Sequence, residues 1–144
     1  MNYLAFIGRI LIGLPFAMSG LNKLAAYGPT TAKIEAVGLP LPPLAFVMAV
    51  AVELGGGLLL VLGYRVRPVA LGLALFSLAT AVSFHSDFAD HYQMIHFLKN
   101  VMMAGGLLQI VAFGAGAMSI SRRSSGALNA GRPHVGVISQ GRIF

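Results

Sequence analysis

The distribution of apolar residues along the chain constrains its fold more than any other feature. A helix that crosses a bilayer needs about 20 mostly apolar residues. Such stretches occur at residues 4–24, 43–62, 68–84 and 95–117. The chain is 57% hydrophobic and only 10% charged, so it cannot cover a water-facing surface with polar groups. We therefore predict an all-α membrane protein, a four-helix transmembrane bundle.

The basic residues predict the orientation of this bundle. The net charge is +6, which in a soluble chain would suggest nucleic acid as a partner. Here most of the basic residues fall on the side of the membrane that also holds both termini. They are Arg65, Arg67, Arg122, Arg123, Arg132 and Arg142, with Arg9 close to that side. Because Lys and Arg favour the cytoplasmic face, we expect both termini in the cytoplasm and no nucleic-acid partner.

The segments outside the spans predict the domain organisation. Gly28 to Thr31 favour a break after the first span, followed by a short helix over 33–37 and an extended entry into the second span. The tail over 121–144 is basic and poor in apolar periodicity, which is typical of disordered chain. We therefore predict a membrane domain over 1–120 and a disordered cytoplasmic tail.

A few ionisable and polar side chains lie within or beside the predicted spans. Charges in the bilayer are costly and usually face a bundle interior, where they mark either a structural ion pair or a functional site. Helical spacing places Arg9, Glu53 and Lys99 on faces that we expect to turn inward. The candidate ligand-binding pocket comprises Arg9, Lys23, Glu53, His85, His96, Lys99 and Asn100.

The carboxylate of Glu53 lies near the middle of the second span and needs a cationic partner. At about 1.5 Å per residue, it lies roughly 15 Å from the outer end of its span. Lys99 approaches it from that end, through long side chains or water, and Arg9 approaches it from the opposite side. The sequence leaves both partners open.

Histidines and aspartates gather around the loop between the third and fourth spans. They are His85, Asp87, Asp90, His91 and His96. Their spacing matches no metal-binding motif, so we expect a solvated loop and no metal. Ligation of a haem by His85 and His96 is a minor alternative. The absence of cysteine excludes thiol redox chemistry and Cys-ligated iron–sulfur clusters.

Several short blocks of the sequence resemble the DoxX family of small four-span bacterial inner-membrane proteins. The blocks are Gly8-Arg9-Ile10, Phe16 to Leu24, Val37 to Pro40, Val52 to Gly56, Leu62 to Arg65, Arg67-Pro68, Phe97 to Asn100 and Ala104 to Gly106. Arg9, Glu53, Lys99 and Asn100 match motif positions of the family. The likeness covers residues 7–123 and leaves out the tail.

The resemblance implies a redox-associated role without assigning a reaction. The family takes its name from a small membrane subunit associated with thiosulfate:quinone oxidoreductase or quinol-oxidase activity, and other members are linked to redox homeostasis. It thus implies quinone as a ligand and a redox enzyme as a partner in the lipid bilayer. Two other functions stay open: a solute or proton pathway through Glu53, which with four spans would need a second copy as a partner, and a non-catalytic scaffold.

Overall fold

The computed structural model describes residues 2–116, and this part of the chain is built of helices and short connections. The elements are α1 (Asn2–Ala25), α2 (Tyr27–Ala36), α3 (Pro42–Val50), the π-helix η1 (Ala51–Gly55), α4 (Gly56–Leu62), α5 (Val66–Phe84) and α6 (His91–Phe113). Four segments are long and apolar enough to cross a membrane: Tyr3–Ala25, Pro42–Leu62, Val66–Phe84 and His91–Phe113. The predicted four-helix transmembrane bundle is confirmed.

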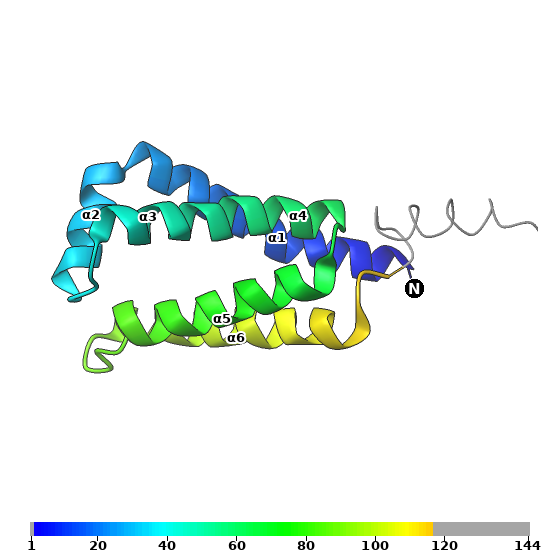
Figure 1. The fold of residues 1–144 in the computed structure, drawn as a ribbon. Helices are drawn as coiled ribbons and strands as arrows, with labels where there is room; N and C mark the ends of the chain where they lie inside the picture. Colours follow the sequence, from blue (N-terminus) through cyan, green and yellow to red (C-terminus); the bar gives the residue numbers. More distant parts are fainter. Residues whose placement is uncertain (1, 117–144) are drawn as a thin grey trace, which may run out of the picture.

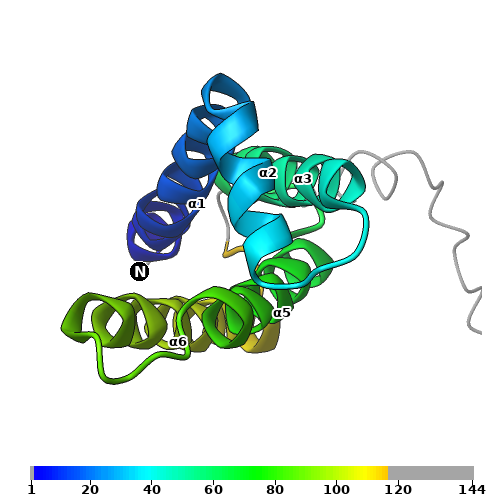
Figure 2. The same ribbon diagram turned by 90° about the vertical axis from the view of Figure 1, so that its left-hand side faces the viewer.

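The spans form two layers. α1 lies beside the continuous span made of α3, η1 and α4, and α5 pairs with α6 in the other layer (Figure 1). The short helix α2 lies across one end of the bundle, between α1 and α3 (Figure 2). We call this the α2 end, and the opposite end, where α4 turns into α5, the α4–α5 end.

Glycines in the left-handed region terminate two of the helices. Gly63 has φ 76° after α4, and Gly38 has φ 77° after α2. At each position the next residue donates its N–H back into the helix, from Tyr64 to the Leu59 carbonyl at 3.0 Å and from Leu39 to the Ile34 carbonyl at 3.3 Å. These hydrogen bonds satisfy backbone carbonyls that would otherwise have no donor at the helix end, and they make both turns tight.

The fourth span begins earlier than the sequence indicated. α6 starts at His91 rather than residue 95 because the Asp90 carboxylate caps it, accepting the Tyr92 N–H at 2.8 Å. Its last residue is Phe113.

The expected break at Gly28 to Thr31 is wrong. α2 begins at Tyr27 and runs through all four positions, and the interruption falls at Ala26 instead. Pro29 is compatible with this helix because its missing N–H falls in the first turn, where no intrahelical bond is made. The buried side chain of Ile34 then fixes α2 against Phe46 and Val50 of α3.

Glycines bring α1 unusually close to the second span. A Cβ on Gly57 would lie 2.6 Å from the Gly13 carbonyl oxygen, and one on Gly20 would lie 2.7 Å from the Leu54 amide nitrogen. Small residues of this kind allow transmembrane helices to approach backbone to backbone. The contacts set the register between the two spans.

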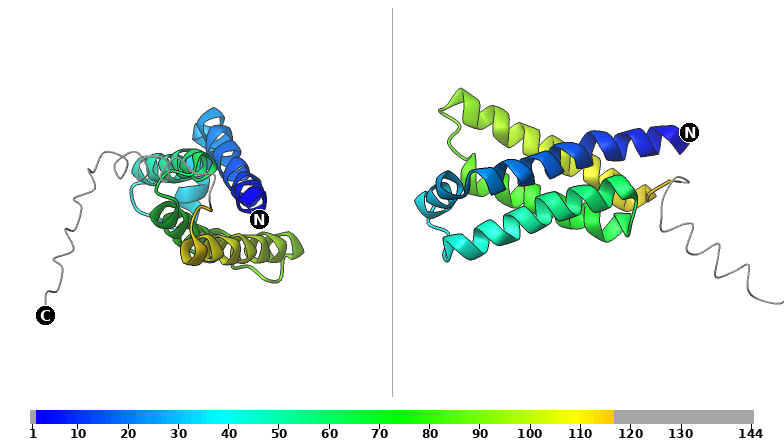
Figure 3. Two further views of the ribbon diagram at one scale, coloured as in Figure 1. Left: turned by 90° about the vertical axis from the view of Figure 1, so that its right-hand side faces the viewer. Right: turned by 90° about the horizontal axis from the view of Figure 1, so that it is seen from above.

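α6 is the most peripheral span. It packs along α5 and touches α1 only lightly, where Gly106 faces Ile12. Figure 3 shows α6 crossing α1 at an angle, so that the two helices diverge toward the α2 end. Leu107 of α6 is nonetheless fully buried, together with Leu60 and Leu73, in the main apolar core.

The predicted disordered tail over 121–144 lies outside the described residues. The side of the membrane on which the termini lie stays a prediction.

Candidate functional site

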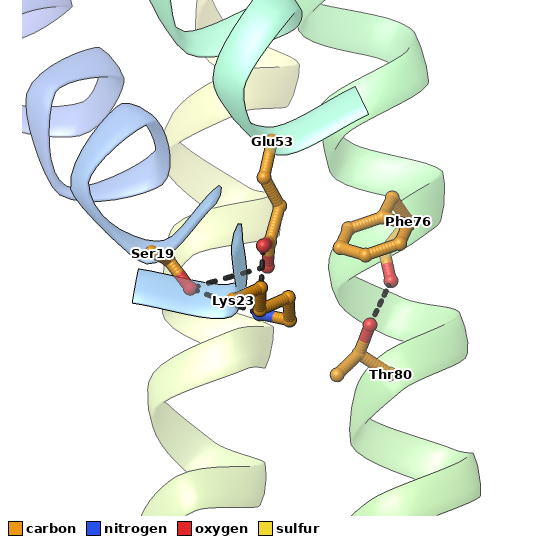
Figure 4. A network of polar contacts seen from close by, with 5 residues as sticks. All are labelled: Ser19, Lys23, Glu53, Phe76 and Thr80. Carbon is orange, nitrogen blue, oxygen red and sulfur yellow. Dashed lines mark hydrogen bonds and ion pairs between the residues drawn. The ribbon is translucent and has the colours of Figure 1, made fainter. Parts of the chain in front are cut away.

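Glu53 forms an ion pair with Lys23 inside the bundle. The Lys23 Nζ lies 2.7 Å from Glu53 Oε2, and the side chains are 28% and 7% exposed. Ser19, one helical turn before Lys23, donates its hydroxyl to Glu53 Oε1 at 3.3 Å and accepts from Lys23 Nζ at 3.1 Å. Figure 4 shows the three side chains converging from α1 and η1. Both charges are therefore satisfied where bulk water is scarce.

A local irregularity of the second span carries the carboxylate. Glu53 is the central residue of η1, which interrupts an otherwise α-helical segment over five residues. A single turn of π-helix changes the direction of the side chains on it and is frequent at functional sites. Gly55 ends η1 and Gly56 begins α4, where the chain returns to the α-helical form.

Both partners that we expected for Glu53 are wrong. Lys99 is exposed on α6, and Arg9 lies at the α4–α5 end, about 21 Å from Lys23 along the rise of α1. There the buried Arg9 donates to the Leu60 carbonyl at 3.5 Å and lies over the Phe6 ring.

The register between α1 and the second span explains this correction. Because Gly20 packs on Leu54, Lys23 lies one turn farther toward the α2 end, where its ammonium reaches Glu53. The last turns of α1 thus lie beside η1, and α2 continues from the end of α1 to pack on α3 (Figure 1).

A cavity of about 660 Å³ adjoins the ion pair at the α2 end. Residues of α1, α2, α3, η1 and α5 line it. Ser19, Lys23 and Glu53 form a polar wall, and apolar side chains such as Val52, Phe76 and Ile34 form much of the rest. Cavities of this size and character are typical of small-molecule sites.

A second polar group lies between α5 and α6. His85, which lines the cavity, stacks on His96 with ring centroids 5.0 Å apart and 26° between the planes. His85 Nδ1 lies 2.7 Å from Gln93 Oε1, and His96 Nδ1 lies 3.2 Å from Lys99 Nζ. The direct contact of the two rings leaves no room for a porphyrin between them, so in this arrangement they are not axial ligands of one haem.

The polar residues of α6 do not reach the cavity. Asn100 is buried as expected, but its amide donates to the carbonyl of His96 at 2.9 Å within the same helix. His96 and Lys99 are exposed, so the predicted inward face of α6 is wrong for Lys99. Within residues 2–116, no three His, Cys, Asp or Glu side chains are grouped so that they could hold a metal ion.

The candidate residues therefore fall into three groups. Lys23, Glu53 and His85 line the cavity, whereas His96, Lys99 and Asn100 lie beside it on α6, and Arg9 lies at the other end. Sequence reasoning missed Ser19, Lys33 and Thr80 as lining residues. Only Ser19 had a signal, because residues four apart on a helix are neighbours and Ser19 precedes Lys23 by four.

The fold and the intramembrane ion pair define an integral membrane protein with four spans. The profile of the DoxX family matches residues 4–86. The chain is 39% identical to the inner membrane protein YqjF of Escherichia coli (strain K12) over 119 residues, covering 81% of this chain and 88% of the relative. It is 35% identical to the inner membrane protein YphA of the same organism over 130 residues, covering 83% and 89%.

The chain belongs to the DoxX family, and it is an inner membrane protein, as the sequence predicted. No solved structure matches it at a significant level.

Proposed function

We propose that this protein is a redox-associated membrane subunit that holds a quinone in the cavity at the α2 end. The observation that carries the proposal is the position of the Lys23–Glu53–Ser19 group in the wall of a mostly apolar cavity of about 660 Å³. A quinone is neutral and lipophilic, and its carbonyl oxygens accept hydrogen bonds. The cavity supplies both of the environments that such a molecule needs.

Lys23 is the donor suited to a quinone carbonyl. Its ammonium carries three N–H groups, of which Ser19 Oγ and Glu53 Oε2 take two. The third is available to a ligand in the cavity, which Lys23 lines. Because Glu53 balances the charge of Lys23, the wall favours a neutral polar head over an anion.

Electron transfer would fall to a partner enzyme. Reduction of a quinone to a quinol takes two electrons and two protons, and this chain has no cysteine to hold an iron–sulfur cluster. The proposed role is therefore to bind and position the quinone for a redox enzyme in the same membrane.

A proton or solute pathway through Glu53 has less support. A carboxylate that relays protons must exchange its hydrogen-bond partners, whereas Glu53 is held by Lys23 at 2.7 Å and by Ser19 at 3.3 Å. The ion pair fits a fixed hydrogen-bonding wall better than a relay.

Quinone binding by the purified protein tests the proposal. A short-chain quinone is titrated into the wild type in lipid nanodiscs, with binding followed by calorimetry. We expect saturable binding that is lost in the double variant Lys23→Met/Glu53→Gln, which removes the donor without leaving a lone buried charge. Lys99→Met is the matched control, since Lys99 does not line the cavity. Absence of saturable binding to the wild type would refute the proposal.

A further inference from the structure

The exposed residues that line the cavity lie in two places. Asn22 of α1 and Lys33 of α2 are exposed lining residues at the α2 end, where the bundle meets the membrane surface. Met48 of α3 and Ala79 of α5 also line the cavity and are exposed, with Met48 58% accessible. The side chains named at the first place are polar, and those at the second place, between α3 and α5, are apolar.

The apolar pair, Met48 and Ala79, lies at the depth of the lipid chains. Met48 is about 9 Å from the start of α3, and Ala79 is about 8 Å from the end of α5, by the rise of a helix. The start of α3 and the end of α5 both lie toward the α2 end of the bundle (Figure 1). A gap between two spans at this depth faces hydrocarbon.

Packed side chains close the gap above and below this level. At the α2 end, Phe84 of α5 packs against the buried cluster of Ile34, Phe46 and Val50. Toward the centre of the bundle, Val52 and Phe76 pack against the main core. Between these two contacts α5 meets η1 and α4 more than it meets α3. The exposed lining at Met48 and Ala79 is thus bounded on both sides by packed side chains, and we call this part of the lining the window.

From these observations we infer that the cavity takes a long-chain amphiphile, whose hydrocarbon tail passes between α3 and α5 into the bilayer. The inference rests on the proposed function for the identity of the head and adds that the ligand is a tailed lipid. The head lies against Lys23 and Ser19, and the tail leaves past Met48 and Ala79. A tail that stays in the bilayer keeps its apolar surface out of water. Binding of the ligand therefore needs no free energy to remove the tail from the bilayer.

Photolabelling tests the window. Vesicles are prepared with the protein and a small fraction of a long-chain alcohol that carries a diazirine close to its hydroxyl group. After irradiation, we expect the label on Ala49 and Thr80, which line the cavity and are only partly exposed. Ala79→Trp places a large ring in the window and should reduce that label by about tenfold. Val82→Trp is the matched control, because Val82 is 64% exposed on the same helix and does not line the cavity.

Comparing the binding of a long-chain and a short-chain quinone distinguishes a failure of this inference from a failure of the proposed function. Ala79→Trp should weaken binding of a long-chain quinone by about tenfold or more and leave a short-chain quinone unaffected. Equal weakening of both quinones, or of neither, would overturn the window, as would wild-type protein that carries no label on Ala49 and Thr80. If the label appears but neither quinone binds to the wild type, the window stands and the proposed function fails.

Discussion

Gly57 of α4 lies so close to Gly13 of α1 that a Cβ on Gly57 would be 2.6 Å from the Gly13 carbonyl oxygen and 2.7 Å from the Ala17 amide nitrogen. Real Cβ atoms do not approach backbone atoms this closely, and backbone cannot move aside as a flexible side chain can. The close approach aligns α1 with the second span and so brings Lys23 to Glu53.

Adding one methyl group at this contact should therefore destabilise the bundle. We expect Gly57→Ala to lower the free energy of unfolding by about 1–3 kcal/mol, the usual cost of overpacking. Gly72→Ala is the control, since nothing lies within 4 Å of that position. It should be neutral or stabilise α5 by up to about 1 kcal/mol through helix propensity. Unfolding in a graded detergent mixture measures both variants, and equal stabilities would contradict the packing described for Gly57.

The ion pair predicts that substitutions at Lys23 and Glu53 have non-additive effects on the free energy of unfolding. Lys23→Met leaves the carboxylate of Glu53 buried without its cation, which should cost about 3–5 kcal/mol of stability. Lys23→Met/Glu53→Gln removes the charge as well and should recover most of that loss. Lys99→Met, which removes an exposed lysine, should change stability by less than about 0.5 kcal/mol. A double variant as unstable as Lys23→Met would show that the loss of stability does not come from the unpaired carboxylate.

The orientation of the bundle can be measured with single cysteines, because the chain has none of its own. Ala89→Cys lies in the exposed loop between α5 and α6, and Tyr64→Cys lies in the turn between α4 and α5. The positive-inside rule predicts that a membrane-impermeant maleimide labels Ala89→Cys in intact spheroplasts and labels Tyr64→Cys only after lysis. The reverse pattern would place both termini outside.

The sequence predicted the spans and the inward position of Glu53 because both follow from local patterns. Hydropathy over about 20 residues identifies a span, and steps of three and four identify a helix face. It did not predict that Lys23 pairs with Glu53, because that contact depends on how far α1 is displaced along its neighbour. The displacement is set by glycine contacts between the spans and by the orientation of α2, neither of which is encoded in the spacing within one helix.

The error at Lys99 has a related cause. Its spacing from His96 and Asn100 marks a polar face, but a polar face turns inward only where another helix covers it. α6 diverges from α1 toward the α2 end, so Lys99 stays exposed and contacts His96 of its own helix (Figure 3). A lysine in such a place can extend its ammonium to the membrane surface.

The most direct test of the account is the quinone content of the protein taken from its own membrane. The wild type and Lys23→Met/Glu53→Gln are extracted with polymer into native nanodiscs, and quinone and phospholipid are quantified for each. We predict that the wild type carries quinone above the ratio of the surrounding membrane and that the double variant does not. An equal ratio of quinone to phospholipid in the two preparations would contradict a quinone site at Lys23 and Glu53.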